Sequence, residues 1–176
     1  DMKAKTVLGA AIGQCVHVAG MEHFLQVCEQ NGWKAVSLGP AVPIARLIEA
    51  VRQESPDVVA VSYRLTAEDA VPLFEQLHKA AKAAVPNTLR WVFGGTPPVA
   101  EKAREWDLFE RVFDGTEPAE SVEAYIKGQT PAVIAAHAAD TLVPRIEETY
   151  PFPLIRHHYG EPDVKRTIRG ARKIAQ

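Results

Sequence analysis

The sequence predicts a doubly wound α/β domain, a five-stranded parallel sheet with helices on both faces. Short apolar runs of strand length alternate with segments whose apolar residues recur at helical spacing, which is typical of βαβ units. The third run, residues 58–63, is apolar enough for a central strand that is covered on both faces. Loops rich in small residues follow these runs, at the edge where such sheets bind ligands.

The predicted elements follow one another through residues 6–127. We expect strands over residues 6–12, 34–38, 58–63, 89–93 and 111–114, and helices over residues 21–31, 43–54, 66–84, 97–106 and 118–126. Asn31-Gly32 ends the first helix. Thr66 is the expected N-cap of the third helix, with Asp69 at a capping-box-like spacing, and Pro118 opens the fifth. Five strands joined by right-handed crossovers complete one flavodoxin-like or Rossmann-like domain.

A change of pattern near residue 128 marks the end of this domain, which we assign to residues 1–128. Residues 129–176 form a C-terminal extension or a linker to a further domain, with helical patterns over residues 132–139 and 163–175. The extension has too little apolar sequence for a core of its own, so we expect it to pack on the first domain, a partner chain or a further domain. The chain begins at Asp1 and ends within a helical pattern, as a fragment of a longer protein would.

Composition and charge exclude several classes of function. The chain is 47% hydrophobic and 24% charged with a formal net charge of −2, so no basic field attracts nucleic acid. No apolar run approaches the roughly 20 residues that span a bilayer, and the first residues lack a signal-peptide cleavage pattern. Two cysteines, Cys15 and Cys28, cannot make a disulfide framework. We therefore expect a cytoplasmic protein that binds neither nucleic acid nor membrane.

The candidate site lies where the strands end, because ligands bind beyond the carboxyl ends of an open parallel sheet. The five loops expected there are all rich in Gly, Ser, Thr or Pro, and they cover residues 13–20, 39–43, 62–66, 94–98 and 114–118. Gly13, Gly94 and Gly95 are more glycines than turns alone require, and small residues let a large flat ligand approach the backbone. We count Thr116, in the last loop, among the candidate binding residues.

The first of these loops carries a motif. It reads Gly-Gln-Cys-Val-His-Val-Ala-Gly over residues 13–20, and it resembles the cobalamin-binding loop of corrinoid proteins, whose pattern is Asp-x-His-x-x-Gly. His17 and Gly20 hold the His and Gly positions. Gly13 matches a glycine that precedes the motif in the mutase branch of that family.

Two later loops strengthen the resemblance. The segment Ser62-Tyr63-Arg64-Leu65-Thr66 sits where the family carries Ser-x-Leu after its third strand, and Gly94-Gly95 resembles the glycine pair after its fourth. The three motifs occur in the right order, each at its expected strand end. The chain therefore resembles the cobalamin-binding domain of cobalamin-dependent methyltransferases and mutases.

The resemblance implies a cofactor, cobalamin, and a role for each motif. His17 would replace the lower axial base and ligate cobalt, for which a neutral imidazole is suited. The displaced nucleotide tail would insert between the sheet and the first helix, near Ser62, and Gly94-Gly95 would leave it room. The chain itself would be a carrier module that presents the corrinoid to a catalytic domain or partner protein.

The sequence departs from the family pattern at three positions. Cys15 occupies the place of the Asp that accepts a hydrogen bond from the other nitrogen of the ligating imidazole. A thiol is a weak acceptor, and losing such a partner costs roughly 10- to 100-fold in metal affinity or activity. We interpret Cys15 as an inert cofactor-site residue rather than a redox thiol. Arg64 stands in place of the family's Leu, and Val18 makes the loop more apolar.

Alternatives from other classes remain at this point. The spacing of residues 13–20 favours a radical mutase and that of residues 62–66 favours a methyltransferase, of which we prefer the second. A non-catalytic sensor or interaction domain with weakened cobalt ligation is the alternative from a different class. A phospho-receiver would need acidic residues that are absent from the first and third strand ends, and neither Gly-x-Gly-x-x-Gly nor a Walker loop occurs. Flavin binding rests on fold analogy alone.

Overall fold

Five parallel strands form the sheet, which confirms the predicted fold class. The computed structural model describes residues 3–129, and its strands are β1 (Thr6–Ala11), β2 (Lys34–Ser37), β3 (Val58–Tyr63), β4 (Arg90–Gly95) and β5 (Phe109–Phe113). Their order across the sheet is β2-β1-β3-β4-β5, the flavodoxin-like order of doubly wound folds. The strand order reverses at β1 and β3, so the carboxyl ends of these two strands mark the expected ligand crevice.

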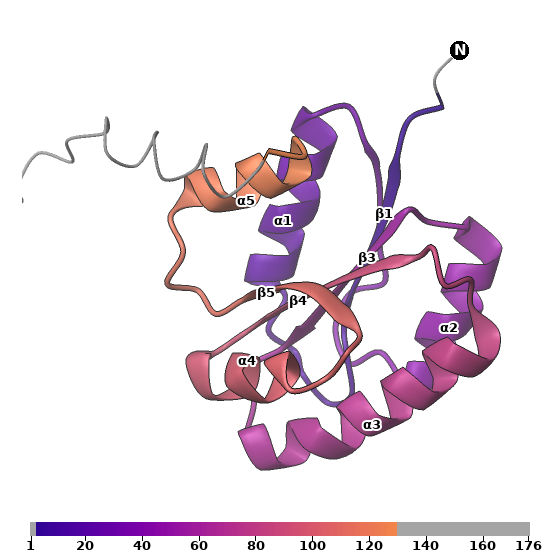
Figure 1. The fold of residues 1–176 in the computed structure, drawn as a ribbon, viewed down its shortest axis with the longest axis vertical. Helices are drawn as coiled ribbons and strands as arrows, with labels where there is room; N and C mark the ends of the chain where they lie inside the picture. Colours follow the sequence, from indigo (N-terminus) through magenta and orange to yellow (C-terminus); the bar gives the residue numbers. More distant parts are fainter. Residues whose placement is uncertain (1–2, 130–176) are drawn as a thin grey trace, which may run out of the picture. The chain divides into compact units, whose positions relative to one another are not determined.

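The helices cover the sheet unequally. They are α1 (Ala19–Gln30), α2 (Ile44–Glu54), α3 (Ala67–Ala84), α4 (Pro97–Arg104) and α5 (Ala119–Ile126). Figure 1 shows α1 and α5 side by side on one face of the sheet, with α2, α3 and α4 on the other. Two buried clusters correspond to the two faces, one built around Phe74 and Phe93 and the other around Met21 and Phe24.

The face beneath α2, α3 and α4 is filled by aromatic side chains. The ring of Phe74 on α3 meets Phe93 of β4 edge-on, with 5.1 Å between the ring centroids, and lies 5.7 Å from the ring of Phe109 on β5. Phe74 is completely buried. Such pairs contribute about 0.5–1.5 kcal/mol each beyond their burial, so this face is a packed core.

The other face brings α1 very close to β1, because Gly9 has no side chain. A Cβ atom at Gly9 would lie 2.7 Å from Sδ of Met21 and 2.9 Å from Cδ1 of Leu25. Gly9 therefore fixes how closely the helix approaches the first strand. The strand pattern does not reveal this role, because it does not distinguish Gly9 from any other small residue of a strand.

The ends of several elements differ from the prediction by one or two residues. The first helix begins at Ala19, two residues early, because the amide of Glu22 already donates to the carbonyl of Val18. Strand β4 continues through Gly94 and Gly95, which pair with β3. The third helix begins as predicted: the Thr66 hydroxyl accepts a hydrogen bond from the amide of Asp69 at 3.2 Å.

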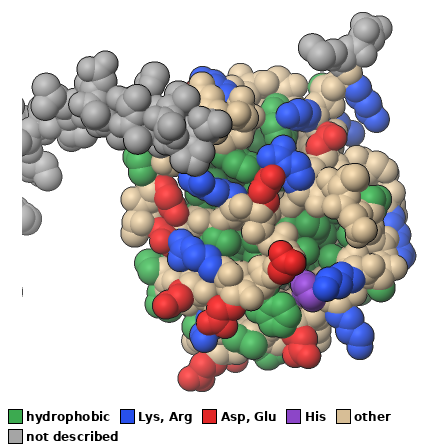
Figure 2. All heavy atoms as spheres, viewed as in Figure 1, with side chains coloured by type: hydrophobic (Ala, Val, Ile, Leu, Met, Phe, Trp, Pro, Cys, Tyr) green, Lys and Arg blue, Asp and Glu red, His purple; other side chains and the backbone are tan. Residues whose placement is uncertain are grey.

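The surface carries charges of both signs. Figure 2 shows Lys and Arg side chains mixed with Asp and Glu side chains on the face viewed, with hydrophobic side chains in small patches between them. No helix within residues 3–129 has the length and hydropathy needed to cross a bilayer. The helices predicted over residues 132–139 and 163–175 lie outside the described residues, and the division of the chain at residue 128 stays a prediction.

Candidate functional site

A cavity of about 210 Å³ lies between the sheet and helices α1 and α5. It opens over the carboxyl-terminal halves of β3 and β4, beside the point where the strand order reverses. The lining comes from α1, β3, β4, β5, the loop after β5, and α5. The cavity therefore lies at the edge where the sequence predicts ligand binding.

Small side chains on the sheet create this space. Ala60 and Ser62 are two positions apart on β3, so both side chains point to the face that carries α1. Gly94 of β4 pairs with Ser62. A Cβ atom at Gly94 would meet nothing within 4 Å, and the same holds at Gly20, at the start of α1. Both glycines line the cavity. A side chain at Gly94 would therefore project into open space where a ligand could lie.

The neighbouring glycine has a different role. A Cβ atom at Gly95 would lie 2.6 Å from the carbonyl oxygen of Tyr63 and 2.8 Å from the ring of Phe93. Its lack of a side chain is required by packing on the opposite face of the sheet. Burial raises the pKa of the Tyr63 hydroxyl, and the nearby Asp69 and Cys15 raise it further. Of the predicted glycine pair, Gly94 leaves room for a ligand and Gly95 is required for the fold.

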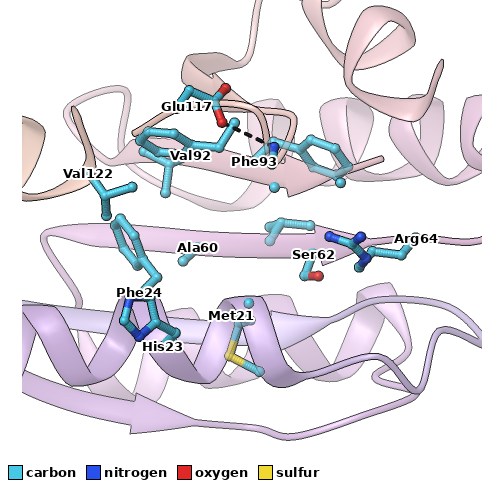
Figure 3. Close-up of a pocket in the computed structure, with 16 residues that line it drawn as sticks. Met21, His23, Phe24, Ala60, Ser62, Arg64, Val92, Phe93, Glu117 and Val122 are labelled. Carbon is cyan, nitrogen blue, oxygen red and sulfur yellow. Dashed lines mark hydrogen bonds between the residues drawn. The ribbon is translucent and has the colours of Figure 1, made fainter. Parts of the chain in front are cut away.

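The cavity has a cation at the end where β3 ends and a mostly apolar lining elsewhere, with His23 beside Phe24. Figure 3 shows the guanidinium of Arg64 close to Ser62 where β3 ends, whereas Phe24 and Val122 lie back towards the start of the strand, away from that edge. Aliphatic and aromatic side chains make up most of the remaining lining, with Val92 and Phe113 among them. An aromatic or aliphatic group entering from the strand ends would pass the guanidinium first.

The loop after β5 is held by its own carboxylates. Glu117 accepts hydrogen bonds from the amides of Asp114 at 2.8 Å and Gly115 at 3.0 Å, the second of which is dashed in Figure 3. Hydrogen bonds from the hydroxyl and amide of Thr116, and then from Arg104, lower the pKa of Asp114 well below its ordinary value. The predicted residue Thr116 thus bonds to Asp114 and does not line the cavity. Its neighbours Gly115 and Glu117 do.

The first loop is anchored by Cys15. This side chain is completely buried, and its Sγ accepts a hydrogen bond from the amide of Arg64 at 3.3 Å. The same Sγ lies 3.8 Å from Nδ1 of His17, whose side chain is exposed. Cys15 therefore links the first loop to the β3–α3 loop. It contacts Nδ1 of His17 and leaves the other ring nitrogen, Nε2, outside this contact.

Gly13, at the start of this loop, is required by its conformation. Its φ angle is +65°, and a Cβ atom there would lie 2.7 Å from Cδ1 of Leu73 on α3. Its amide also donates to the carbonyl of Val42 at 3.0 Å. The structure thus gives Gly13 a backbone role that sets the course of the loop.

The structure brings some of the predicted site residues together and leaves others apart. Gly20, Ser62, Gly94 and Gly95 line the cavity. Four others, Gly13, Cys15, His17 and Leu65, lie in the loops at the same edge without lining it. Sequence reasoning did not assign the α1 residues Met21, His23 and Phe24 or the loop residue Glu117 to the site. Apolar residues at helical spacing are the same signal whether they pack in a core or line a cavity.

One imidazole is the metal ligand that this edge offers. Residues 3–129 contain no group of three or more His, Cys, Asp or Glu side chains placed to hold a metal ion. A single imidazole fits a metal that arrives with an equatorial ring of ligands, as axial histidines do in haem proteins. His17 could therefore serve as an axial ligand to a metal carried by a macrocycle.

One family model matches the sequence. The model of the B12 binding domain matches residues 5–123, more than half of the chain. No curated protein matches the sequence at a significant level.

Three solved structures have a similar fold. A cobalamin-binding protein from Desulfitobacterium hafniense is 22% identical, with a TM-score of 0.58 over 71% of this chain and 59% of that one. The methanol:cobalamin methyltransferase complex from Methanosarcina barkeri is 19% identical, with a TM-score of 0.57 over 76% of this chain and 50% of that one. The monomethylamine corrinoid protein from the same organism is 16% identical, with a TM-score of 0.57 over 72% and 59%. The match thus covers 50% to 59% of each of those chains.

Proposed function

The chain belongs to the B12-binding domain family, and from that premise we propose that it is a carrier module that presents cobalamin to a catalytic domain or partner protein for methyl transfer. The observation that carries the proposal is the cavity of about 210 Å³, which opens at the sheet edge beside the loop of His17. Cobalamin consists of a large flat corrin ring around cobalt and a nucleotide tail that ends in an aromatic base. The site must accept both parts.

The cavity fits the tail and not the corrin. Pockets that enclose a drug-sized molecule measure about 300–1,000 Å³, and this one is smaller. Phe24, Phe113 and Val122 offer apolar contacts to an aromatic base. Gly94 leaves the space into which a side chain would otherwise project. The residues present therefore fit an aromatic tail inserted between α1 and the sheet.

The corrin would rest outside, on the loops at the strand ends. Val16 and Leu65 are the exposed large hydrophobic side chains in the described part of the chain, with 63% and 38% of their surface accessible. Both belong to loops at this edge, and each directly follows one of the two residues that the Cys15–Arg64 hydrogen bond joins. Covering them with a flat macrocycle would contribute about 25 cal/mol for each Å² of apolar surface removed from water.

His17 would hold the cobalt through Nε2. Its Nδ1 faces the Cys15 thiol at 3.8 Å, so the other ring nitrogen is the one left to bind a metal. Bound cobalamin supplies a cobalt that accepts and releases a methyl group. The chain's own contribution is to bind the tail, orient the ring and hold the imidazole.

The reaction that we propose for the bound cofactor is methyl transfer. The Ser62 and Leu65 spacing supports it, and one similar structure is a methanol:cobalamin methyltransferase complex. One observation favours the alternative, a sensor or interaction domain with weakened ligation. It is the thiol of Cys15 beside His17, since a thiol is a poor acceptor for the imidazole N–H.

Equilibrium dialysis with hydroxocobalamin tests the proposal. A single cobalamin should be retained by each chain, with a visible spectrum that differs from that of the free cofactor. No retention at about 100 μM cofactor, which corresponds to less than about 5.5 kcal/mol of binding free energy, would overturn the carrier function and leave the interaction domain.

A further inference from the structure

Arg64 is the cation at the mouth of the cavity. It follows the last residue of β3, is exposed, and is part of the cavity lining. In Figure 3 its guanidinium lies beside Ser62, on the side of the cavity where the strand ends, and not among the apolar residues near Val122. Anything that enters from the carboxyl edge passes this charge.

The backbone of Arg64 is fixed, so its side chain starts from a defined point at this edge of the sheet. Its amide donates to Sγ of Cys15 at 3.3 Å. Two residues earlier, the carbonyl of Ser62 accepts from the amide of Ile12 at 3.0 Å. Both bonds tie the end of β3 to the first loop, and neither uses the side chain of Arg64.

The guanidinium of Arg64 makes no ion pair within the described part of the chain. The ion pairs among residues 3–129 join Lys34 to Glu54, Arg90 to Glu110, Lys102 to Glu105, Arg104 to Asp114 and Lys127 to Glu123. None includes Arg64. The carboxylate in the cavity lining, Glu117, already accepts two backbone amides. Among the described residues, the guanidinium of Arg64 therefore makes no ion pair, and it lies next to a mostly apolar lining.

We propose that Arg64 binds the phosphodiester of the cobalamin nucleotide tail, an inference that rests on the proposed cobalamin binding. The tail carries a single negative charge on that phosphate, which comes before the ribose and the aromatic base. The cavity has the same order, with a cation at its mouth and aromatic side chains such as Phe24 and Phe113 inside. A guanidinium forms two parallel hydrogen bonds to a phosphate, which a lysine cannot. The role belongs to this chain's Arg64, where the resembled pattern has an apolar residue.

Binding of two corrinoids to Arg64→Leu tests this assignment. Hydroxocobalamin has the phosphodiester, whereas aquocobinamide has the same ring and cobalt without phosphate, ribose or base. Arg64→Leu should weaken cobalamin binding by about three- to tenfold, the range for a charged hydrogen bond at a partly exposed site. It should leave cobinamide binding unchanged. Arg64→Lys should lie between Arg64→Leu and the wild type, because it retains the charge and loses the two-pronged geometry.

A matched control and a second measurement complete the test. Arg52, exposed at the far edge of the sheet near the end of α2, provides the control: Arg52→Leu removes the same charge and should change neither affinity. Higher salt should weaken cobalamin binding to the wild type more than to Arg64→Leu, since the phosphate contact is screened. Equal salt dependence, equal weakening of both corrinoids, or unchanged cobalamin binding in Arg64→Leu would each overturn the role of Arg64. Absence of cobalamin binding to the wild type would instead overturn the proposed function itself.

Discussion

The Sγ of Cys15 lies 3.8 Å from Nδ1 of His17, so a buried thiol stands where the resembled motif has a carboxylate. This contact makes the thiol part of the environment of the imidazole. The loop is still tied to the β3–α3 loop through the hydrogen bond from the amide of Arg64 to Cys15. His17 thus has a thiol, a weak hydrogen-bond acceptor, beside its Nδ1 atom.

Cys15→Asp should tighten cobalamin binding while lowering stability. The carboxylate would accept the N–H of His17 and make its other nitrogen a better ligand, which is worth up to about tenfold to a hundredfold in affinity. The position is completely buried, so introducing a charge there should cost about 1–3 kcal/mol of unfolding free energy. Equilibrium dialysis and urea melts measure the two effects separately. Cys15→Ser, which adds no charge, is the control and should leave affinity nearly unchanged.

The effect of Cys15→Asp should depend on His17. In a double-mutant cycle, the gain in affinity should vanish in the His17→Ala background, because an aspartate at position 15 acts on cobalt only through the imidazole. An equal gain in both backgrounds would mean that residue 15 contacts the cofactor directly.

The two glycines at the end of β4 should respond in opposite ways to added side chains. Gly95→Ala should lower the unfolding free energy by about 1–3 kcal/mol, because its methyl group would press against the Tyr63 carbonyl. Gly94→Ala, whose Cβ meets nothing within 4 Å, is the matched control and should change stability little. Thermal or urea melts measure the unfolding free energy of both variants, and equal losses would contradict the different roles of the two glycines.

Filling the cavity should block the tail and spare the fold. Gly94→Leu places a branched side chain in the space next to Ser62 and should weaken cobalamin binding by about tenfold or more. Cobinamide, which has no tail, should bind Gly94→Leu as it binds the wild type. Wild-type cobalamin affinity in Gly94→Leu would show that the tail does not enter this cavity.

Stability should fall at alkaline pH because of Cys28. Burial, followed by the nearby charge of Glu29, raises the pKa of this thiol to about 12. The unfolded chain therefore loses the proton at lower pH than the folded one. The contribution of Cys28 is fully present below about pH 9 and declines as the pH rises towards about 12. Urea melts at about pH 8 and about pH 10 should show a smaller loss of stability in Cys28→Val than in the wild type. Equal losses would contradict the raised pKa.

The elements that sequence alone placed best are those with a local signal. Strand β3 and the start of α3 match the prediction, because a continuous apolar run and an N-cap threonine depend on neighbouring residues only. The edge of the sheet that carries the site followed from the α/β pattern in the same way.

The parts of the site that sequence alone missed depend on packing between distant segments. Gly94 and Gly95 are equivalent in the sequence, and only the opposite faces of β4 assign one to the cavity and the other to the core. Phe24 lines the cavity because Gly9 brings α1 close to β1, a contact that no local pattern reveals. Glu117 enters the site by capping two amides of a loop whose course depends on the whole sheet.

The visible spectrum of bound hydroxocobalamin in the wild type and in His17→Ala tests the central claim most directly. If this imidazole ligates the cobalt of a carried cobalamin, the wild-type spectrum should differ from that of the free cofactor. His17→Ala should give a bound spectrum that differs from that of the wild type while keeping part of the affinity, since tail burial and the contact at Arg64 persist. Identical spectra for the two proteins would contradict axial ligation by His17, and failure of the wild type to retain the cofactor would contradict the carrier function as a whole.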